Sequence, residues 1–245
     1  MGSARLPGKV MSIVEGQPMI ALLLRRLESA TRIDEVVLAT SVRPENDPLA
    51  EAVIHMGFRV HRGSEDDVLS RMIEAASDAT SIVRITGDCP FTDPGIVDEV
   101  CAAFDSGCVD YASNVDPPTF PDGLDVEVVS TDALRRVAAL EHEGRFREHV
   151  TLAIRERPGF RRVNIANQRD LSALRWTVDE ASDLEVARGV FAHFRPRLDF
   201  GWREVLELAE RTPRLFGANA GIPRNEGLVM GEADKRFRSG RRPSP

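Results

Sequence analysis

The chain has 245 residues, of which 42% are hydrophobic, and it carries a formal net charge of -7 at pH 7. A chain of this length can bury a substantial core in one or two domains, and its mild acidity argues against a general nucleic-acid-binding protein. The three cysteines have no CxxC spacing, and the longest apolar run, MIALLL, is too short to span a bilayer. We therefore expect a soluble cytoplasmic protein without zinc, a disulfide framework or a signal peptide.

The first two-thirds of the chain alternate between short β-branched runs and amphipathic helical patterns. In chain order, the pattern predicts a helix over 16–30, a strand over 34–41, a helix over 47–57, a strand over 58–64, a helix over 65–79, a strand over 81–88 and a helix over 93–107. Such alternation is typical of a mainly parallel sheet that is covered by helices on both faces.

After residue 110 the pattern changes. Predicted strands over 109–114 and 124–130 are separated by a proline-rich loop, VDPPTFPDG, that could form one wall of a cleft. A helix over 144–157, strands over 160–167 and 174–179, and a helix over 180–194 follow. We expect a single domain over 1–227 and a disordered tail over 228–245, because that last segment is highly charged and lacks apolar periodicity.

Two aspartates, Asp88 and Asp179, stand at the carboxyl ends of predicted strands, just past their apolar residues. Ligands of open parallel sheets bind beyond the carboxyl ends of the strands, and two carboxylates that meet there form a typical Mg²⁺ site. The alternative is that each aspartate only caps the helix that follows it, since Asp is a favoured N-cap residue. The pair, together with a basic loop at the start of the chain, favours the metal site.

That basic loop is the opening stretch, MGSARLPGKV. Gly2 and Gly8 would let backbone amides approach phosphate oxygens, and Arg5 and Lys9 would add positive charge. Taken alone, such a stretch is more often a surface turn with solvated charges.

Two further motifs each leave two interpretations open. In RGS at 62–64, backbone groups and Arg62 could hold the edge of a nucleobase, or Ser64 could simply cap the next helix. In FREHVT, His149 follows Arg147 and Glu148 on a predicted helix, where a lone histidine is more often structural than catalytic.

Nine stretches follow one another in a characteristic order from residue 1 to about residue 227: MGSARLPGKV, VVLATS, HRGSEDDVLSR, VRITGDCPFTDP, DYASN, FPDGLDVEVV, REHVT, LRWTVDEASDL and RNEG. Together they resemble the cytidylyltransferases that make CMP-activated acidic sugars, especially the branch of spore-coat polysaccharide biosynthesis. Relatives in this family make CMP-N-acetylneuraminate and CMP-3-deoxy-manno-octulosonate.

The resemblance implies a fold, a reaction and a set of site residues. The fold would be a three-layer, mainly parallel α/β sheet of the nucleotide-diphospho-sugar transferase (Rossmann-like) type, with a smaller element that helps to form a homodimer. Ser3, Arg5 and Lys9 would lie in the pyrophosphate-binding loop, and Thr40, Ser41, Arg62, Gly63, Ser64 and Thr86 would bind the nucleotide. Asp88 and Asp179 would hold Mg²⁺, with Arg5, Lys9 and Asp88 as the catalytic residues. The acceptor would lie near Asn114, Asp122, Glu127, Arg147 and His149.

The first residue departs from the family's pattern. Members of the family begin with a hydrophobic strand of about ten residues that ends in a Gln-Ala-Arg-like triplet, and Met1 aligns with the residue after that arginine. We therefore expect that this strand and a phosphate-contacting arginine are encoded upstream of Met1.

The expected function is the transfer of CMP from CTP to an acidic sugar or related acid, with release of pyrophosphate. Two alternatives stay open. A glycosyltransferase on a similar sheet would need a DxD metal motif, for which DVE at 125–127 is a poor match. A non-catalytic pseudoenzyme subunit would fail to bind CTP.

Overall fold

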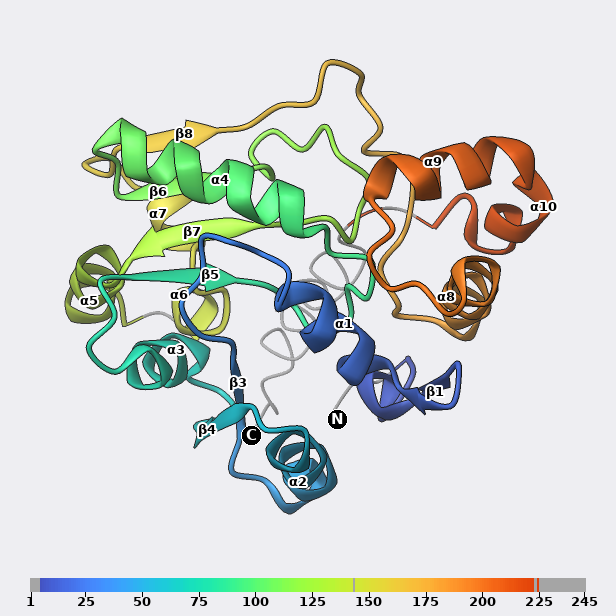
Figure 1. Ribbon diagram of the computed structural model, residues 1–245. Coiled ribbons are helices and arrows are strands. Elements are labelled where there is room, and N and C mark those ends of the chain that lie inside the picture. Colours follow the sequence, from blue (N-terminus) through green and yellow to red (C-terminus); the bar gives the residue numbers. More distant parts are fainter. Residues whose placement is uncertain (1–4, 143, 223, 225–245) are drawn as a thin grey trace, which may run out of the picture.

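A computed structural model describes residues 5–142, 144–222 and 224 (Figure 1). Ser3 and the tail expected over 228–245 lie outside these residues. Helices surround a central set of strands that includes parallel pairs, which confirms the predicted α/β class (Figure 1). No helix in this described part of the chain is long and apolar enough to cross a membrane.

The largest sheet has four strands in the order β5 (Ser81–Arg84), β7 (Glu127–Ser130), β6 (Tyr111–Ser113) and β8 (Arg162–Asn164). β7 is antiparallel to both of its neighbours, whereas β6 and β8 are parallel. The sheet is therefore mixed. The proline-rich loop that joins β6 to β7 contains no helix, and parallel strands are usually joined by a helical crossover.

Two further pairs of strands complete the set. β3 (Val37–Ser41) and β4 (Arg59–Gly63) form a parallel pair in which the two strands end together, because Ser41 stands opposite Gly63. β1 (Ile13–Val14) and β2 (Gln17–Pro18) form a short antiparallel hairpin.

Three of the helices begin at a residue whose side chain caps the first turn. Asp67 accepts a hydrogen bond from the amide of Ser70 (3.0 Å), Asp93 accepts one from Gly95 (2.8 Å), and Ser130 accepts one from Ala133 (3.1 Å). The α-helices are α1 (Met19–Leu27), α2 (Asp47–His55), α3 (Val68–Ala76), α4 (Pro94–Gly107), α5 (Thr131–Leu140), α6 (Gly144–Glu148), α7 (Leu152–Glu156), α8 (Ala181–Phe194), α9 (Trp202–Arg211) and α10 (Pro213–Phe216), and 3₁₀ turns occur at Lys9–Met11, Pro44–Asn46 and Gly217–Asn219.

Three predicted elements take a different form, and the β1–β2 hairpin and the helices α9 and α10 were not predicted. The helix expected over 16–30 begins only at Met19, because the residues before it belong to the β1–β2 hairpin. The helix expected over 144–157 is interrupted between α6 and α7. The segment 174–179, expected as a strand, forms no regular strand and makes one isolated bridge, from Arg175 to Asp122.

Side-chain alternation along the four-stranded sheet divides the core in two. On β6 and β7, Ala112 and Val128 face the larger hydrophobic cluster, whereas Tyr111 and Val129 face a smaller one. α4 covers the first face, and α5 and α3 lie on the other side of the sheet (Figure 1). Both faces are therefore buried, as expected for a three-layer α/β fold.

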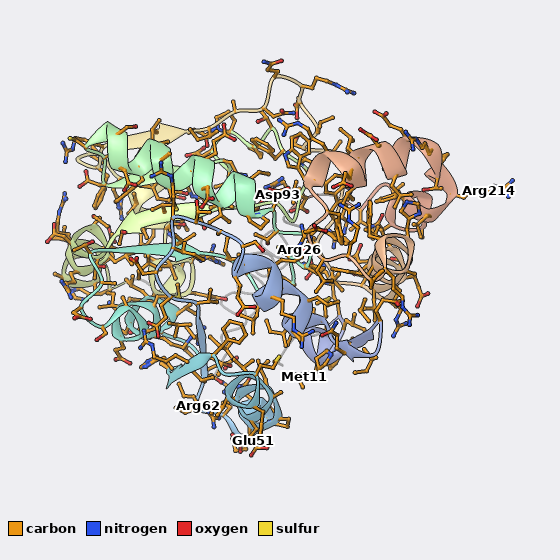
Figure 2. The ribbon with its side chains drawn as sticks, in the orientation of Figure 1. Met11, Arg26, Glu51, Arg62, Asp93 and Arg214 are labelled. Atoms are coloured by element: carbon orange, nitrogen blue, oxygen red, sulfur yellow. The ribbon has the colours of Figure 1, made fainter. Side chains whose placement is uncertain are left out.

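A buried arginine fixes α1 to the segment that precedes α4. Arg26 donates hydrogen bonds to the carbonyl oxygens of Thr92 (3.2 Å) and Leu198 (2.5 Å), and its guanidinium group lies 4.2 Å from the centre of the Phe200 ring. Figure 2 shows Arg26 beside Asp93, at the start of α4. Burial lowers the pKa of Arg26 to about 10, so the side chain is still charged at neutral pH. These contacts hold in place the chain segment that carries Asp88.

Candidate active site

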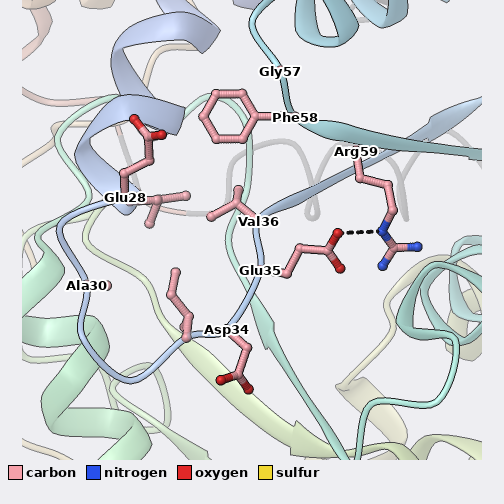
Figure 3. Close-up of a pocket in the computed structure, with 10 residues that line it drawn as sticks. Glu28, Ala30, Asp34, Glu35, Val36, Gly57, Phe58 and Arg59 are labelled. Carbon is pink, nitrogen blue, oxygen red and sulfur yellow. Dashed lines mark hydrogen bonds and ion pairs between the residues drawn. The ribbon is translucent and has the colours of Figure 1, made fainter.

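A cleft of about 310 Å³ lies where the segments 84–89, 149–155 and 177–179 meet. A second pocket, of about 400 Å³, opens at the amino ends of β3 and β4, where Val36 and Phe58 line it and Glu35 pairs with Arg59 (Figure 3). Several of the residues that the sequence singles out line the cleft, and none of them lines the second pocket. Those that line the cleft are Arg5, Thr86, Asp88, Asp122, Glu127, His149 and Asp179.

Lys9 joins the two predicted metal-binding aspartates. Its ammonium nitrogen lies 2.6 Å from Asp88 Oδ2 and 2.6 Å from Asp179 Oδ1. Burial alone would lower the pKa of Lys9, but the charges and hydrogen bonds of the two carboxylates outweigh it and raise the pKa. The two carboxylates thus converge on one cation, the Lys9 ammonium group.

Backbone hydrogen bonds bring these aspartates together from distant parts of the chain. The amide of Val178 donates to the carbonyl oxygen of Asp88 (2.8 Å), and the Thr177 hydroxyl lies 3.4 Å from the same oxygen. Neither aspartate is a helix cap, because Asp93 caps α4 and Asp183 accepts the amides of Asp179 and Glu180 at the start of α8 (both 2.9 Å). The capping alternative is therefore wrong for both residues.

Arg175 organises the carboxylates behind the cleft. Its side chain is only 5% exposed, and it donates to Asp183 (3.0 Å) and to Asp179 Oδ2 (3.1 Å), with Asp122 at 3.7 Å. Arg5 approaches the same Asp179 oxygen to 3.0 Å. Burial would raise the pKa of Asp179, but Lys9, Arg5 and Arg175 lower it instead, so that this carboxylate is ionised at neutral pH.

Gly123 allows the proline-rich loop to pack against the segment that carries Asp179. Its φ is +104°, and a Cβ atom there would lie 2.6 Å from the Thr177 amide nitrogen. The neighbouring Asp122 exchanges backbone hydrogen bonds with this segment, at 2.8 Å to Leu174 and 2.7 Å from Trp176. Only glycine fits this close approach, which places the Asp122 side chain at the cleft.

Glu127 forms the centre of a fully bonded network at one end of the cleft. One of its oxygens accepts hydrogen bonds from the Tyr111 hydroxyl (2.6 Å) and the Thr151 hydroxyl (2.5 Å), and the other pairs with Arg84. Burial would raise the pKa of Glu127, but Arg84 and the hydroxyl donors lower it. Glu127 is thus a fixed anion that orients Arg84.

A second acidic pair, Asp122 and Asp125, lies between β6 and β7. Arg224 donates to Asp125 Oδ1 (2.5 Å) and lies 3.9 Å from Asp122 Oδ1. Burial raises the pKa of Asp122 to about 6, an effect that Arg224 only partly offsets, and burial also raises the pKa of Asp125. Protonation of these two carboxyl groups is therefore favoured relative to an ordinary aspartate.

The predicted cytidine-binding residues lie together at the carboxyl ends of β3 and β4. Arg62 donates to the carbonyl oxygens of Ser41 (3.1 Å) and Arg43 (3.0 Å) and pairs with Asp47 (2.6 Å); Figure 2 shows it beside α2. Gly63 is close-packed, because a Cβ atom there would lie 3.0 Å from Arg71 Cγ. Thr40 and Ser41 are buried on β3 next to Gly63. The Ser64 hydroxyl accepts the amide of Asp67 rather than a helical amide of α3.

Two of the predicted acceptor residues do not line the cleft. Arg147 pairs with Asp67 and donates to Ser70 (2.8 Å), which attaches α6 to α3. Asn114 accepts from the Val126 amide (2.8 Å) and donates to the Leu124 carbonyl oxygen (2.7 Å), so it closes the base of the proline-rich loop. Both side chains are occupied in holding the fold together.

The sequence reasoning missed four arginines of this region. Arg84, Arg155 and Arg224 line the cleft, and Arg175 lies behind it. Three of them stand in stretches quoted above, Arg84 in VRITGDCPFTDP, Arg175 in LRWTVDEASDL and Arg224 in RNEG, although no role was predicted for them. Arg155 stands in none of these stretches and is not distinguishable from the many surface arginines of this chain.

A model of the family described as cytidylyltransferase matches residues 1–201. The spore coat polysaccharide biosynthesis protein SpsF of Bacillus subtilis is 34% identical over 226 residues, which cover 87% of this chain and 92% of that protein. The chain therefore belongs to the cytidylyltransferase family, whose members use CTP.

Other relatives give the same result. A 3-deoxy-manno-octulosonate cytidylyltransferase of Geobacter sulfurreducens is 36% identical over 104 residues, which cover 41% of this chain and 40% of that protein. The solved structure of a cytidylyltransferase from Leptospira borgpetersenii matches with a TM-score of 0.85 at 28% identity, covering 91% of this chain and 95% of that one. The structure of a CMP:2-keto-3-deoxy-manno-octonic acid synthetase with CTP shares the fold, with a TM-score of 0.58 at 18% identity, covering 78% and 95%.

Proposed function

We propose that this cytidylyltransferase transfers CMP from CTP to an oxygen of an acidic sugar or related acid, and that it uses Mg²⁺. The observation that carries the proposal is the convergence of Asp88 and Asp179 on one cation, Lys9, with Arg5 beside them. The resemblance to SpsF and to the 3-deoxy-manno-octulosonate enzymes supports an acidic acceptor.

Asp88 and Asp179 are the residues that would hold Mg²⁺. Their oxygens already share one positive charge, and Mg²⁺ usually binds through one or two carboxylates, with phosphates and waters as its other ligands. The lack of a group of three or more His, Cys, Asp or Glu ligands among the described residues is compatible with such a site. When bound, Mg²⁺ would supply positive charge to the reacting phosphate.

The chain's own residues would position the two substrates. Arg5 and Lys9 bind the pyrophosphate that leaves, since charge-assisted hydrogen bonds to phosphate are strong. Thr40, Ser41, Arg62, Gly63 and Ser64 hold the cytidine at the ends of β3 and β4. Rate enhancement then comes from orientation and from charge stabilisation.

The glycosyltransferase alternative lacks support in the side-chain contacts. In the DVE segment, Asp125 is paired with Arg224 and Glu127 with Arg84. The two carboxylates of this DxD-like segment are thus each engaged by an arginine, whereas Asp88 and Asp179 share one cation.

We further propose a cytoplasmic homodimer. The three cysteines, Cys89, Cys101 and Cys108, are not in disulfides, as is usual in a reducing compartment. The dimer follows from the family resemblance, and light scattering of the purified protein tests it.

The decisive experiment measures pyrophosphate release with CTP, Mg²⁺ and a panel of acidic sugars. We predict that Asp88→Asn and Asp179→Asn each lower the rate by about 100-fold or more, because the amide keeps the shape but loses the charge at the reacting phosphate. Both variants should keep the melting temperature within a few degrees and should lose Mn²⁺ binding in calorimetry. Asp105→Asn, at an exposed site, is the matched control. Full activity in either active-site variant would falsify the two-aspartate site.

A further inference from the structure

We propose that Arg155 binds the carboxylate of the acceptor and thereby makes the enzyme select an acidic acceptor. This inference rests on the proposed function. It assigns a specificity-determining role to a residue that the sequence motifs do not single out.

Arg155 lies on α7 and lines the same cleft as Asp88 and Asp179. Its Nε atom is buried and has no hydrogen-bond partner, whereas its terminal nitrogens are not among the buried unpaired atoms. Among the described residues, no carboxylate lies within ion-pair distance of its guanidinium group. A buried donor without a partner needs an explanation, and this side chain belongs to a residue that lines the cleft.

The other cationic side chains of the cleft are already engaged. Arg84 pairs with Glu127, Arg224 pairs with Asp125, and Arg5 pairs with Asp179. Arg155 therefore differs from its neighbours in the described part of the cleft, because its charge is not matched by an adjacent carboxylate of the chain. A carboxylate brought by the ligand would supply the missing partner.

A purely structural role as a partner of Glu127 does not account for Arg155. Glu127 already accepts hydrogen bonds from Tyr111 and Thr151 and pairs with Arg84. Arg155 adds only a longer-range electrostatic contribution to Glu127. Its planar group of N–H donors matches the geometry of a carboxylate, and no such group of the chain fills that place.

The position also fits the reaction. A cleft of about 310 Å³ is at the lower end of the range for small-molecule pockets, so one sugar-sized acid would fill it. Asp88 and Asp179 line the cleft on the segments after β5 and before α8, whereas Arg155 lines it from α7. An acceptor whose carboxylate is held by Arg155 would thus lie within the same cleft as the reacting phosphate.

The test compares Arg155→Gln and Arg155→Lys with wild-type protein, with the exposed Arg135→Gln on α5 as the matched control. The probes are N-acetylneuraminate, 3-deoxy-manno-octulosonate and the methyl ester of N-acetylneuraminic acid, which keeps the sugar but removes the charge. Calorimetry measures the binding of each probe to protein loaded with CMP, and pyrophosphate release gives KM and kcat wherever a probe is turned over.

We expect the wild type to bind at least one acid more tightly than the ester. Arg155→Gln should weaken acid binding about 10- to 100-fold, the contribution of a lost charge-assisted hydrogen bond, while the affinity for CTP, the kcat and the ester affinity change little. Arg155→Lys should recover part of the acid affinity, which a merely structural role would not require. Arg135→Gln should behave as the wild type.

Three results would overturn the proposal: an Arg155→Gln variant that keeps the wild-type acid-to-ester ratio, a wild type that does not distinguish acid from ester, or a nucleotide-loaded wild type that binds neither acid. Failure of the proposed function has a different signature. In that case the wild type would neither bind CTP nor release pyrophosphate, whatever residue stands at position 155.

Discussion

Lys9 can pair either with the carboxylates of Asp88 and Asp179 or with the phosphates of a bound nucleotide. The structure shows it paired with the two carboxylates. Its side chain is 12% exposed and those of Asp88 and Asp179 are 25% and 19% exposed, so water shields these charges only in part. Without Lys9, the two carboxylates would repel each other across a short distance. With a triphosphate bound, Lys9 would gain phosphate oxygens as alternative partners. Lys9 and a divalent cation would therefore compete for the same carboxylate oxygens when no nucleotide is present.

This competition predicts the behaviour of Lys9→Met. In the absence of nucleotide, the variant should bind Mn²⁺ more tightly than the wild type, by roughly two- to tenfold, the range expected for a partly shielded ion pair. Its affinity for CTP should fall, because a phosphate-binding cation is lost. Calorimetry or the electron paramagnetic resonance signal of free Mn²⁺ measures both effects. Unchanged or weaker Mn²⁺ binding would show that Lys9 does not compete with the metal.

The sequence predicted the acidic residues of the site better than its arginines. Asp88 and Asp179 were identifiable because each follows an apolar segment that ends at a known kind of ligand edge. Arg155 was not, because arginines occur throughout this chain and the surroundings of each one depend on tertiary contacts. Arg147 belongs to the quoted motif REHVT, yet its partner, Asp67, is the N-cap residue of α3, 80 residues away.

Among the elements, the segment 174–179 explains why a strand-like pattern need not form a strand. Its backbone groups bond to two different loops: Leu174 and Trp176 to Asp122, and Val178 to Asp88. The alternation of apolar residues therefore indicates only that the segment is buried. Its backbone hydrogen bonds do not form a strand ladder, because they connect the loop at Asp122 with the loop at Asp88. The segment acts as a bridge that fixes Asp122 and Asp179 near Asp88.

The close approach at Gly123 gives a prediction for this bridge. Gly123→Ala would place a Cβ atom 2.6 Å from the Thr177 nitrogen at a φ of +104°, so we expect unfolding free energy to fall by about 3 kcal/mol or more. Gly57→Ala is the control, since Gly57 has a φ of +89° but no atom within 4 Å of the added Cβ; strain alone should cost about 1 kcal/mol there. Urea unfolding measures both. Equal losses in the two variants would mean that the loop yields and that the contact is unimportant.

Across the whole molecule, the strand–helix alternation predicted the layers but not the direction of every strand. Helical and strand periodicity report which faces are buried, and Val128 and Val129 do face opposite cores as the alternation requires. The antiparallel course of β7 is set by its pairing with β5 and β6, which lie far from each other in sequence. Periodicity within one segment contains no information about such partners.

The same packing concentrates negative charge in one place, since Asp88, Asp122, Asp125, Glu127 and Asp179 all line the cleft. The arginines and Lys9 offset this charge unevenly. Glu127 and Asp179 have lowered pKa values, whereas the pKa values of Asp122 and Asp125 are raised. Stability and site charge are therefore linked through Asp122, whose pKa is raised to about 6.

This linkage predicts how the stability of the molecule depends on pH. Burial raises the pKa of Asp122 from 3.8 to about 6; Arg224 and Arg175 oppose the shift, and Asp125 and Asp179 reinforce it. The folded protein thus holds this proton more tightly than the unfolded chain, so the stabilisation is complete below pH 3.8 and is lost as the pH rises through about 6.

Asp122→Asn mimics the protonated form at every pH. The unfolding free energy of the wild type minus that of Asp122→Asn should fall by up to about 3 kcal/mol between about pH 4 and pH 8. Urea titrations across this range, with Asp105→Asn as an exposed control, measure the difference. A difference that is constant with pH, or that grows as the pH rises, would show that the Arg224 and Arg175 charges outweigh the burial of Asp122.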